Sequence, residues 1–179
     1  MFYQCSSLTA APSITADTIV ESGCRDMFAQ SGILSAGTVC AATLDVDACR
    51  GMFWHCDSLT AAPEISATTL STGSCRGMFY QCGSLETPPP VLAATSAAPS
   101  CYAQMFTECA SLTAAPALCA TVPAGDVYKQ MFLRCSRLTS IPELHLTGTA
   151  SGIFYQMFEG CSSVTDASQI TLPEEDIAA

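Results

Sequence analysis

The chain has 179 residues and carries 16 acidic against 6 basic side chains, giving a formal net charge of −10 at pH 7 and a pI of about 4.3. This charge argues against a nucleic-acid-binding protein, which needs a concentrated basic surface. Hydrophobic residues make up 49% of the sequence, enough to form a sizeable core. No apolar run reaches the length of a membrane span, and the N-terminus lacks the pattern of a signal peptide.

An internal repeat covers the chain. All seven methionines are followed by phenylalanine, and successive Met-Phe pairs are separated by 25 to 27 residues. A period of this length is typical of repeats that stack on one another. The sequence therefore predicts a single domain, residues 1–179, in which residues 172–179 leave the pattern as a C-terminal tail or cap. The seven units begin at Met1, Met27, Met52, Met78, Met105, Met131 and Met157.

A short helix is predicted around each Met-Phe pair. With the methionine as position 0, apolar residues recur at positions −3, 0, 1, 4 and 7, the spacing of an amphipathic helix. Position 4 is cysteine in six units and Ser31 in the second unit. A small polar residue such as Ser22 or Asp47 precedes the apolar run as a candidate N-cap.

A short strand is predicted after each helix. Proline at position 11 of five units prevents the helix from continuing, and positions 12 to 15 alternate between outward and inward sides. Neither element is stable alone, so the units must stack. We therefore expect an α/β repeat solenoid with a parallel sheet on one face and short helices on the other. The expected inward residues at position 13 are Ile14, Cys40, Ile65, Val91, Leu118, Leu144 and Ile170.

The unit Met-Phe-x-x-Cys-x-Ser-Leu-Thr-x-Ala-Pro is complete at residues 1–12 and 52–63. It resembles the BspA-type leucine-rich repeat of bacterial surface proteins. The resemblance implies a right-handed, leucine-rich-repeat-like stack, display at the cell surface or in the extracellular space, and adhesion to host or neighbouring-cell proteins. Similar arrays also occur in prophage-encoded proteins. The family has no catalytic residues to transfer. The second and last units depart from the pattern, at Ser31 and Ser168 among other positions.

The twelve cysteines are predicted to be buried free thiols. Cysteines seven residues apart on one helix would be about 10 Å apart, and packed helices of adjacent units about 8–10 Å apart, both too far for a disulfide. A zinc site at His55 and Cys56 is disfavoured because closely spaced ligand pairs are absent from the sequence. A catalytic cysteine is disfavoured because the repeat itself explains position 4. We expect no metal, no cofactor and no enzyme activity.

Two surfaces are candidates for binding a partner. The predicted helix side carries aromatic residues at position 2, namely Tyr3, Trp54 and Tyr80. A basic column at position −2, which includes Arg25, is explained by local pairing with carboxylates such as Asp26. The predicted sheet side is rich in hydroxyl groups and mildly acidic, and is either ordinary solvated sheet or a repetitive binding face. Its candidate residues are Thr9, Thr60, Glu64, Glu86, Thr113, Thr139, Glu143 and Thr165.

These features favour a non-enzymatic, surface-displayed repeat module that binds an extracellular protein or glycan and is joined to further repeats or domains of a longer chain. A structural spacer, or a prophage or virion component without its own ligand, is the alternative. An ice-binding surface is a minor alternative suggested by the threonine column, which Glu86 interrupts.

Overall fold

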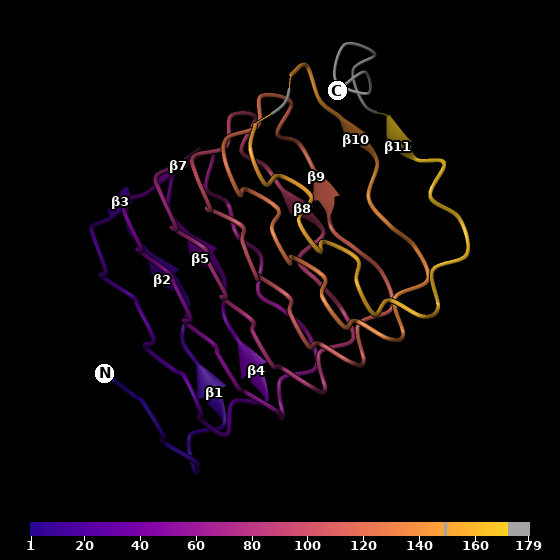
Figure 1. Cartoon of the computed structure of the whole chain (residues 1–179). Coiled ribbons are helices and arrows are strands. Elements are labelled where there is room, and N and C mark those ends of the chain that lie inside the picture. Colours follow the sequence, from indigo (N-terminus) through magenta and orange to yellow (C-terminus); the bar gives the residue numbers. More distant parts are fainter. Residues whose placement is uncertain (149, 172–179) are drawn as a thin grey trace.

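The computed structural model describes residues 1–148 and 150–171. The chain runs in successive coils that lie side by side from the N-terminus to the C-terminal end (Figure 1). Each strand in the described part has two residues. The strands are β1 (Ala10–Ala11), β2 (Ile14–Thr15), β3 (Thr18–Ile19), β4 (Ser35–Ala36), β5 (Val39–Cys40), β6 (Thr43–Leu44), β7 (Thr69–Leu70), β8 (Val91–Leu92), β9 (Ala117–Leu118), β10 (Leu144–His145) and β11 (Ile170–Thr171).

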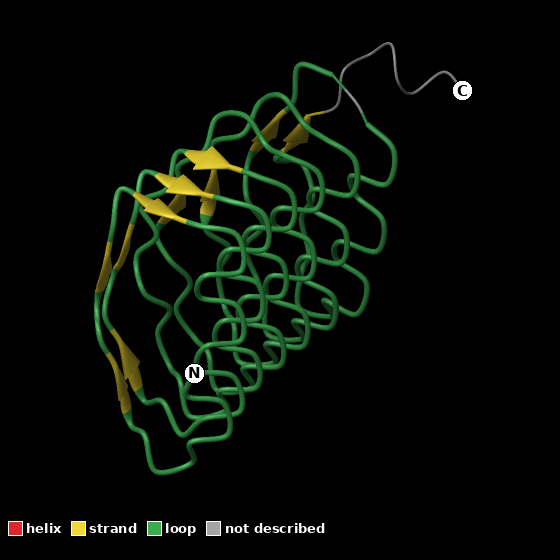
Figure 2. Cartoon of the chain, turned by 90° about the vertical axis from the view of Figure 1, so that its left-hand side faces the viewer, coloured by secondary structure: helices red, strands yellow, loops and turns green. Residues whose placement is uncertain are grey.

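All pairings between these strands are parallel and join successive repeats. β1 pairs with β4, β2 with β5, β8 with β9, and β10 with β11, while β3, β6 and β7 form a three-stranded sheet. Figure 2 shows the strands toward one side of the coils and irregular turns toward the other. The predicted parallel pairing of successive repeats is therefore confirmed.

The predicted helices are wrong, because the described residues contain no helix. The segment around each Met-Phe pair is instead a run of turns in which every fourth residue has a positive φ, between 49° and 78°. These residues occupy positions −5, −1 and 3, so the expected N-caps Ser22 and Asp47 adopt the left-handed conformation instead. The positive-φ residues are Gln4, Ser22, Asp26, Gln30, Asp47, Gly51, His55, Gly73, Gly77, Gln81, Ser100, Gln104, Glu108, Asp126, Gln130, Arg134, Gly152, Gln156 and Gly160.

Backbone hydrogen bonds in the turn segments alternate between two directions. The Phe28 amide donates to the Met52 carbonyl of the next unit (2.9 Å), whereas the Met27 amide donates to the Cys24 carbonyl, three residues earlier in the same turn segment (3.2 Å). The Phe79 and Met78 amides repeat the pattern two units later. Each turn segment therefore makes backbone hydrogen bonds to the neighbouring unit, as a strand does, although its backbone conformation is not that of a strand.

A continuous stack of phenylalanine rings runs through the core. Rings of adjacent units lie nearly parallel, with centroids 5.5 to 5.6 Å apart. Met78, Phe79, Cys82 and Leu85 are fully buried, which confirms the predicted core positions 0, 1, 4 and 7 in this unit. The stacked rings are Phe2, Phe28, Phe53, Phe79, Phe106, Phe132 and Phe158.

The register differs from the expected one in two units. In the second unit, which is one residue shorter, Ile33 is buried and Leu34 is 55% exposed. Val39 rather than Cys40 then lies opposite Ile14. In the fourth unit, which is one residue longer, Val91 is 37% exposed, whereas its neighbour in β8 is buried. Counting from the methionine therefore misassigns residues beyond an insertion or deletion. The predicted C-terminal cap, 172–179, lies outside the described residues.

Replacing Phe79 by alanine should lower the free energy of unfolding by about 3–5 kcal/mol, because the ring is fully buried and stacked on both sides. Phe2→Ala should cost much less, since Phe2 is only partly buried and stacks on one ring. Urea unfolding of both variants measures the difference. Equal losses at the two sites would contradict the stacked core.

Candidate functional site

The predicted sheet-side residues are all exposed, and the threonine column joins successive units. The Thr139 hydroxyl and amide both donate to the Thr113 carbonyl (3.0 Å each). In the second unit, counting from Met27 would put Ser35 in this column, but Ser35 pairs with Ala10 and Leu34 lies beside Thr9 instead, with its amide donating to the Thr9 carbonyl (2.8 Å). The hydroxyl groups therefore contribute to holding the units together. The exposed residues are Thr9, Thr60, Glu64, Glu86, Thr113, Thr139, Glu143 and Thr165.

The three predicted aromatic residues do not form one surface. Tyr3 is 47% exposed and is separated from the others by the buried Ala29. Trp54 and Tyr80 come from consecutive units and line a groove of about 450 Å³ on the turn side. The structure thus separates Tyr3 from the pair formed by Trp54 and Tyr80.

Two glycines lie in this groove. Gly51 and Gly77 occupy position −1, where later units carry glutamine. In those units the glutamine amides are hydrogen-bonded in series, from Gln104 to Gln130 (2.9 Å) and from Gln130 to Gln156 (2.7 Å). At Gly77 the nearest side-chain atom to the position of an added Cβ is the Tyr80 Cβ, at 3.6 Å, so this part of the groove is open; at Gly51 the Asp26 carboxylate lies over the glycine.

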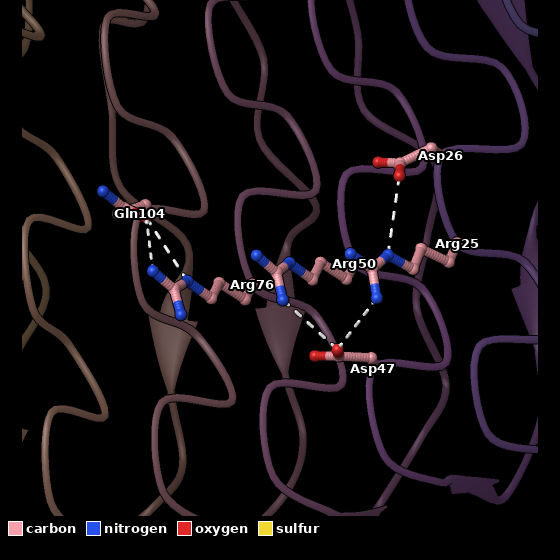
Figure 3. Close-up of polar contacts among 6 residues, drawn as sticks. All are labelled: Arg25, Asp26, Asp47, Arg50, Arg76 and Gln104. Carbon is pink, nitrogen blue, oxygen red and sulfur yellow. Dashed lines mark hydrogen bonds and ion pairs between the residues drawn. The ribbon is translucent and has the colours of Figure 1, made fainter.

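Three arginines from consecutive units lie along the groove (Figure 3). Arg25 and Arg50 both contact Asp47, at 3.4 and 3.2 Å, and Arg25 also contacts Asp26 at 3.5 Å. In Figure 3 the three guanidinium groups follow one another in a row, with the two carboxylates on either side of it. Three guanidinium groups thus meet two carboxylates, which leaves the groove positive on an acidic protein.

Arg76 is paired differently from the other two arginines. Its guanidinium donates to the side-chain oxygen of Gln104 through Nε (3.4 Å) and a terminal nitrogen (3.3 Å). This partner is a neutral amide. Lys129, the fourth residue of the predicted basic column, lies outside the groove, 3.4 Å from Asp126 and over the Tyr155 ring.

Sequence reasoning found the aromatic residues and the arginine column but did not bring them together. It assigned the arginines to local pairing with carboxylates, which is correct for Arg25 and Arg50 and wrong for Arg76, whose guanidinium donates to the Gln104 amide. The available signal was glycine at position −1 in the same two units that carry Trp54 and Tyr80.

The twelve cysteines are free thiols, and nine of them are buried as predicted. The prediction is wrong for Cys40, which is exposed, and for Cys5 and Cys119, which are partly buried. At position 4, the thiols of five units donate to the carbonyl of the phenylalanine in the preceding unit, at 3.0 to 3.1 Å, as Cys82 does to Phe53. The Ser31 hydroxyl makes the equivalent bond to Phe2 at 2.6 Å. The expected spacing of 8–10 Å between units is wrong, because strand-like stacking replaces helix packing and brings adjacent rings to 5.5–5.6 Å.

Burial makes most of these thiols weak acids. It raises the pKa of Cys56 to about 11 and that of Cys75 to about 12. Cys24 is the exception, because a hydrogen bond with the Cys49 thiol lowers its pKa. Within the described ranges, no cluster of three or more His, Cys, Asp or Glu side chains could hold a metal ion. The thiols whose pKa is raised, such as those of Cys56 and Cys75, are therefore protonated at neutral pH and are poor nucleophiles.

Comparisons with protein-family models, curated proteins and solved structures gave no match. Among residues 1–148 and 150–171, no helix is long and apolar enough to cross a membrane. The groove on the turn side therefore has to be interpreted from its own chemistry.

Alkaline pH should destabilise the fold. A thiol whose pKa is raised by folding stabilises the protein below its usual pKa of 9.0, and this contribution is lost as the pH rises toward the folded value. For Cys56 this loss of stability takes place between pH 9.0 and about pH 11. Urea unfolding under reducing conditions should show stability falling in this range, by about 1.4 kcal/mol per pH unit for each such thiol.

Cys56→Ser is the matched control, since Ser31 already occupies the equivalent position in the second unit. Its stability should fall less steeply between pH 9.0 and 11 than that of the wild type, by the contribution of one thiol. Identical slopes would contradict the assignment.

Proposed function

We propose that this protein is a non-enzymatic solenoid of stacked repeats that binds an extracellular protein or glycan partner through the groove on its turn side. The repeat motif resembles surface-displayed adhesive arrays, and a rigid repeat stack offers an extended surface for such contacts. The groove is the observation that carries the proposal.

The composition of the groove supports binding. Arginine and aromatic side chains are enriched where proteins bind partners, and here Arg50, Arg76, Trp54 and Tyr80 line one depression. The repeat needs none of these residue types at positions −2 and 2, because other units carry different residues there. Binding of a partner would explain why they coincide in consecutive units.

A structural spacer, including a prophage or virion component, is the second candidate. It is favoured by the use of backbone and thiol hydrogen bonds to hold adjacent units together, which makes the stack self-supporting. Ice binding is less well supported, because Leu34 and Glu86 interrupt the exposed threonine column.

A pull-down from extracellular proteins and mucins with the immobilised chain tests the proposal. Gly77→Gln fills the groove with a side chain that Gln104, Gln130 and Gln156 already carry in the same left-handed conformation, so the variant should fold. We expect wild type to retain a partner and Gly77→Gln to retain about tenfold less, since the groove is filled.

The double variant Thr60→Lys with Thr113→Lys is the control, since both threonines are exposed and lie outside the groove lining, and it should bind as wild type does. If the double lysine variant loses binding and Gly77→Gln does not, the partner binds the threonine column rather than the groove. Absence of any partner for the wild type would favour the spacer.

A further inference from the structure

The main chain around the groove is already paired. The Gly51 amide donates to the Arg76 carbonyl (3.0 Å), and the Trp54 and Tyr80 amides donate to the carbonyls of Gly51 and Gly77 (2.9 and 3.0 Å). An extended peptide binds a sheet edge through main-chain hydrogen bonds, and these groups are not free to make them. Recognition in the groove therefore depends on side chains.

The charged side chains favour a ligand with a single anionic group. Arg76 is paired with an amide, so an incoming carboxylate can form a charge-assisted, two-point hydrogen bond with its guanidinium. Asp26 and Asp47 lie close to the other two arginines and would repel a second or third anionic group. The same carboxylates can accept hydrogen bonds from hydroxyl groups.

The aromatic side chains favour a ligand with a rigid ring. Trp54 and Tyr80 offer apolar ring surface in consecutive units, against which the C–H face of a pyranose can pack. A sugar ring loses less conformational entropy on binding than a flexible chain does. The groove volume of about 450 Å³ lies in the range of small-ligand sites.

We infer that the groove binds a pyranose that carries one carboxylate, such as a uronic acid or a sialic acid. The carboxylate contacts Arg76, the ring packs on Trp54 and Tyr80, and the hydroxyl groups face Asp26. This inference rests on the proposed function and specifies the ligand of the same groove.

The fluorescence of Trp54, which is the single tryptophan of the chain, reports on the groove directly. Titration with methyl glucuronide and with the methyl glycoside of N-acetylneuraminic acid distinguishes the two sources of the carboxylate. At least one of them should give a saturable change in Trp54 fluorescence, with a midpoint of about 1 mM for so open a site. Methyl glucoside and acetate should each require about tenfold higher concentrations or more, because each lacks half of the recognised chemistry.

Arg76→Gln should weaken saccharide binding by about tenfold or more, because it removes the guanidinium that contacts the carboxylate. Gly77→Gln should abolish it. Arg137→Gln, which removes an arginine outside the groove lining, should bind as the wild type does. Retention of a native circular dichroism spectrum by each variant separates loss of binding from loss of folding.

The two proposals fail in different ways. If the pull-down finds a groove-dependent partner but neither acidic saccharide changes Trp54 fluorescence, the saccharide inference is overturned and the proposed function stands. A capped dipeptide of aspartate and glutamate that binds more tightly than both saccharides would also overturn the inference and indicate an acidic protein partner. If Arg137→Gln and Arg76→Gln lose equal affinity, the assigned contact with Arg76 is wrong.

Discussion

The alternating hydrogen bonds of the turn segments are the constraint on which the rest of the structure depends. Because every fourth residue is left-handed, alternate amides point along the stack, as the Phe79 amide does toward the Met105 carbonyl (2.9 Å). Left-handed backbone is unfavourable for residues other than glycine, so an isolated unit would pay this conformational cost without the hydrogen bonds that offset it. Stability therefore comes from neighbouring units rather than from any single repeat.

The same constraint places equivalent side chains about 5.5 Å apart, the spacing of the stacked phenylalanine rings. Identical residues then form continuous columns. Phenylalanine gives a ring stack, cysteine gives thiols bonded to the preceding unit, and glutamine gives a series of amide hydrogen bonds. The groove arises where the glutamine column is interrupted. Gly77 leaves open space between the neighbouring arginines and aromatic residues, and the Asp26 carboxylate lies over Gly51.

Much of this architecture could be predicted from the sequence, because the repeat period and the buried positions do not depend on the local backbone. The turn conformation around each Met-Phe pair could not be predicted, since a segment of about nine residues is too short to distinguish a helical period of 3.6 residues from a period of 4.0 residues. Glycine recurring at positions −5, −1 and 3, as at Gly51 and Gly73, was the signal against a helix. The groove was missed for a related reason: helical geometry gave no basis for placing Arg76 beside Tyr80, and the register beyond Ser31 could not be known without the strand pairing.

Hydrogen-bond scalar couplings measured by NMR test the backbone arrangement most directly. We expect a coupling between the Phe79 amide nitrogen and the Met105 carbonyl carbon of the next unit, and one between the Met78 amide nitrogen and the Cys75 carbonyl carbon. A helix would instead couple the Phe79 amide to the carbonyl of Cys75, four residues earlier. Observation of that helical coupling, without the one to Met105, would contradict the stacked turn segments and the groove built on them.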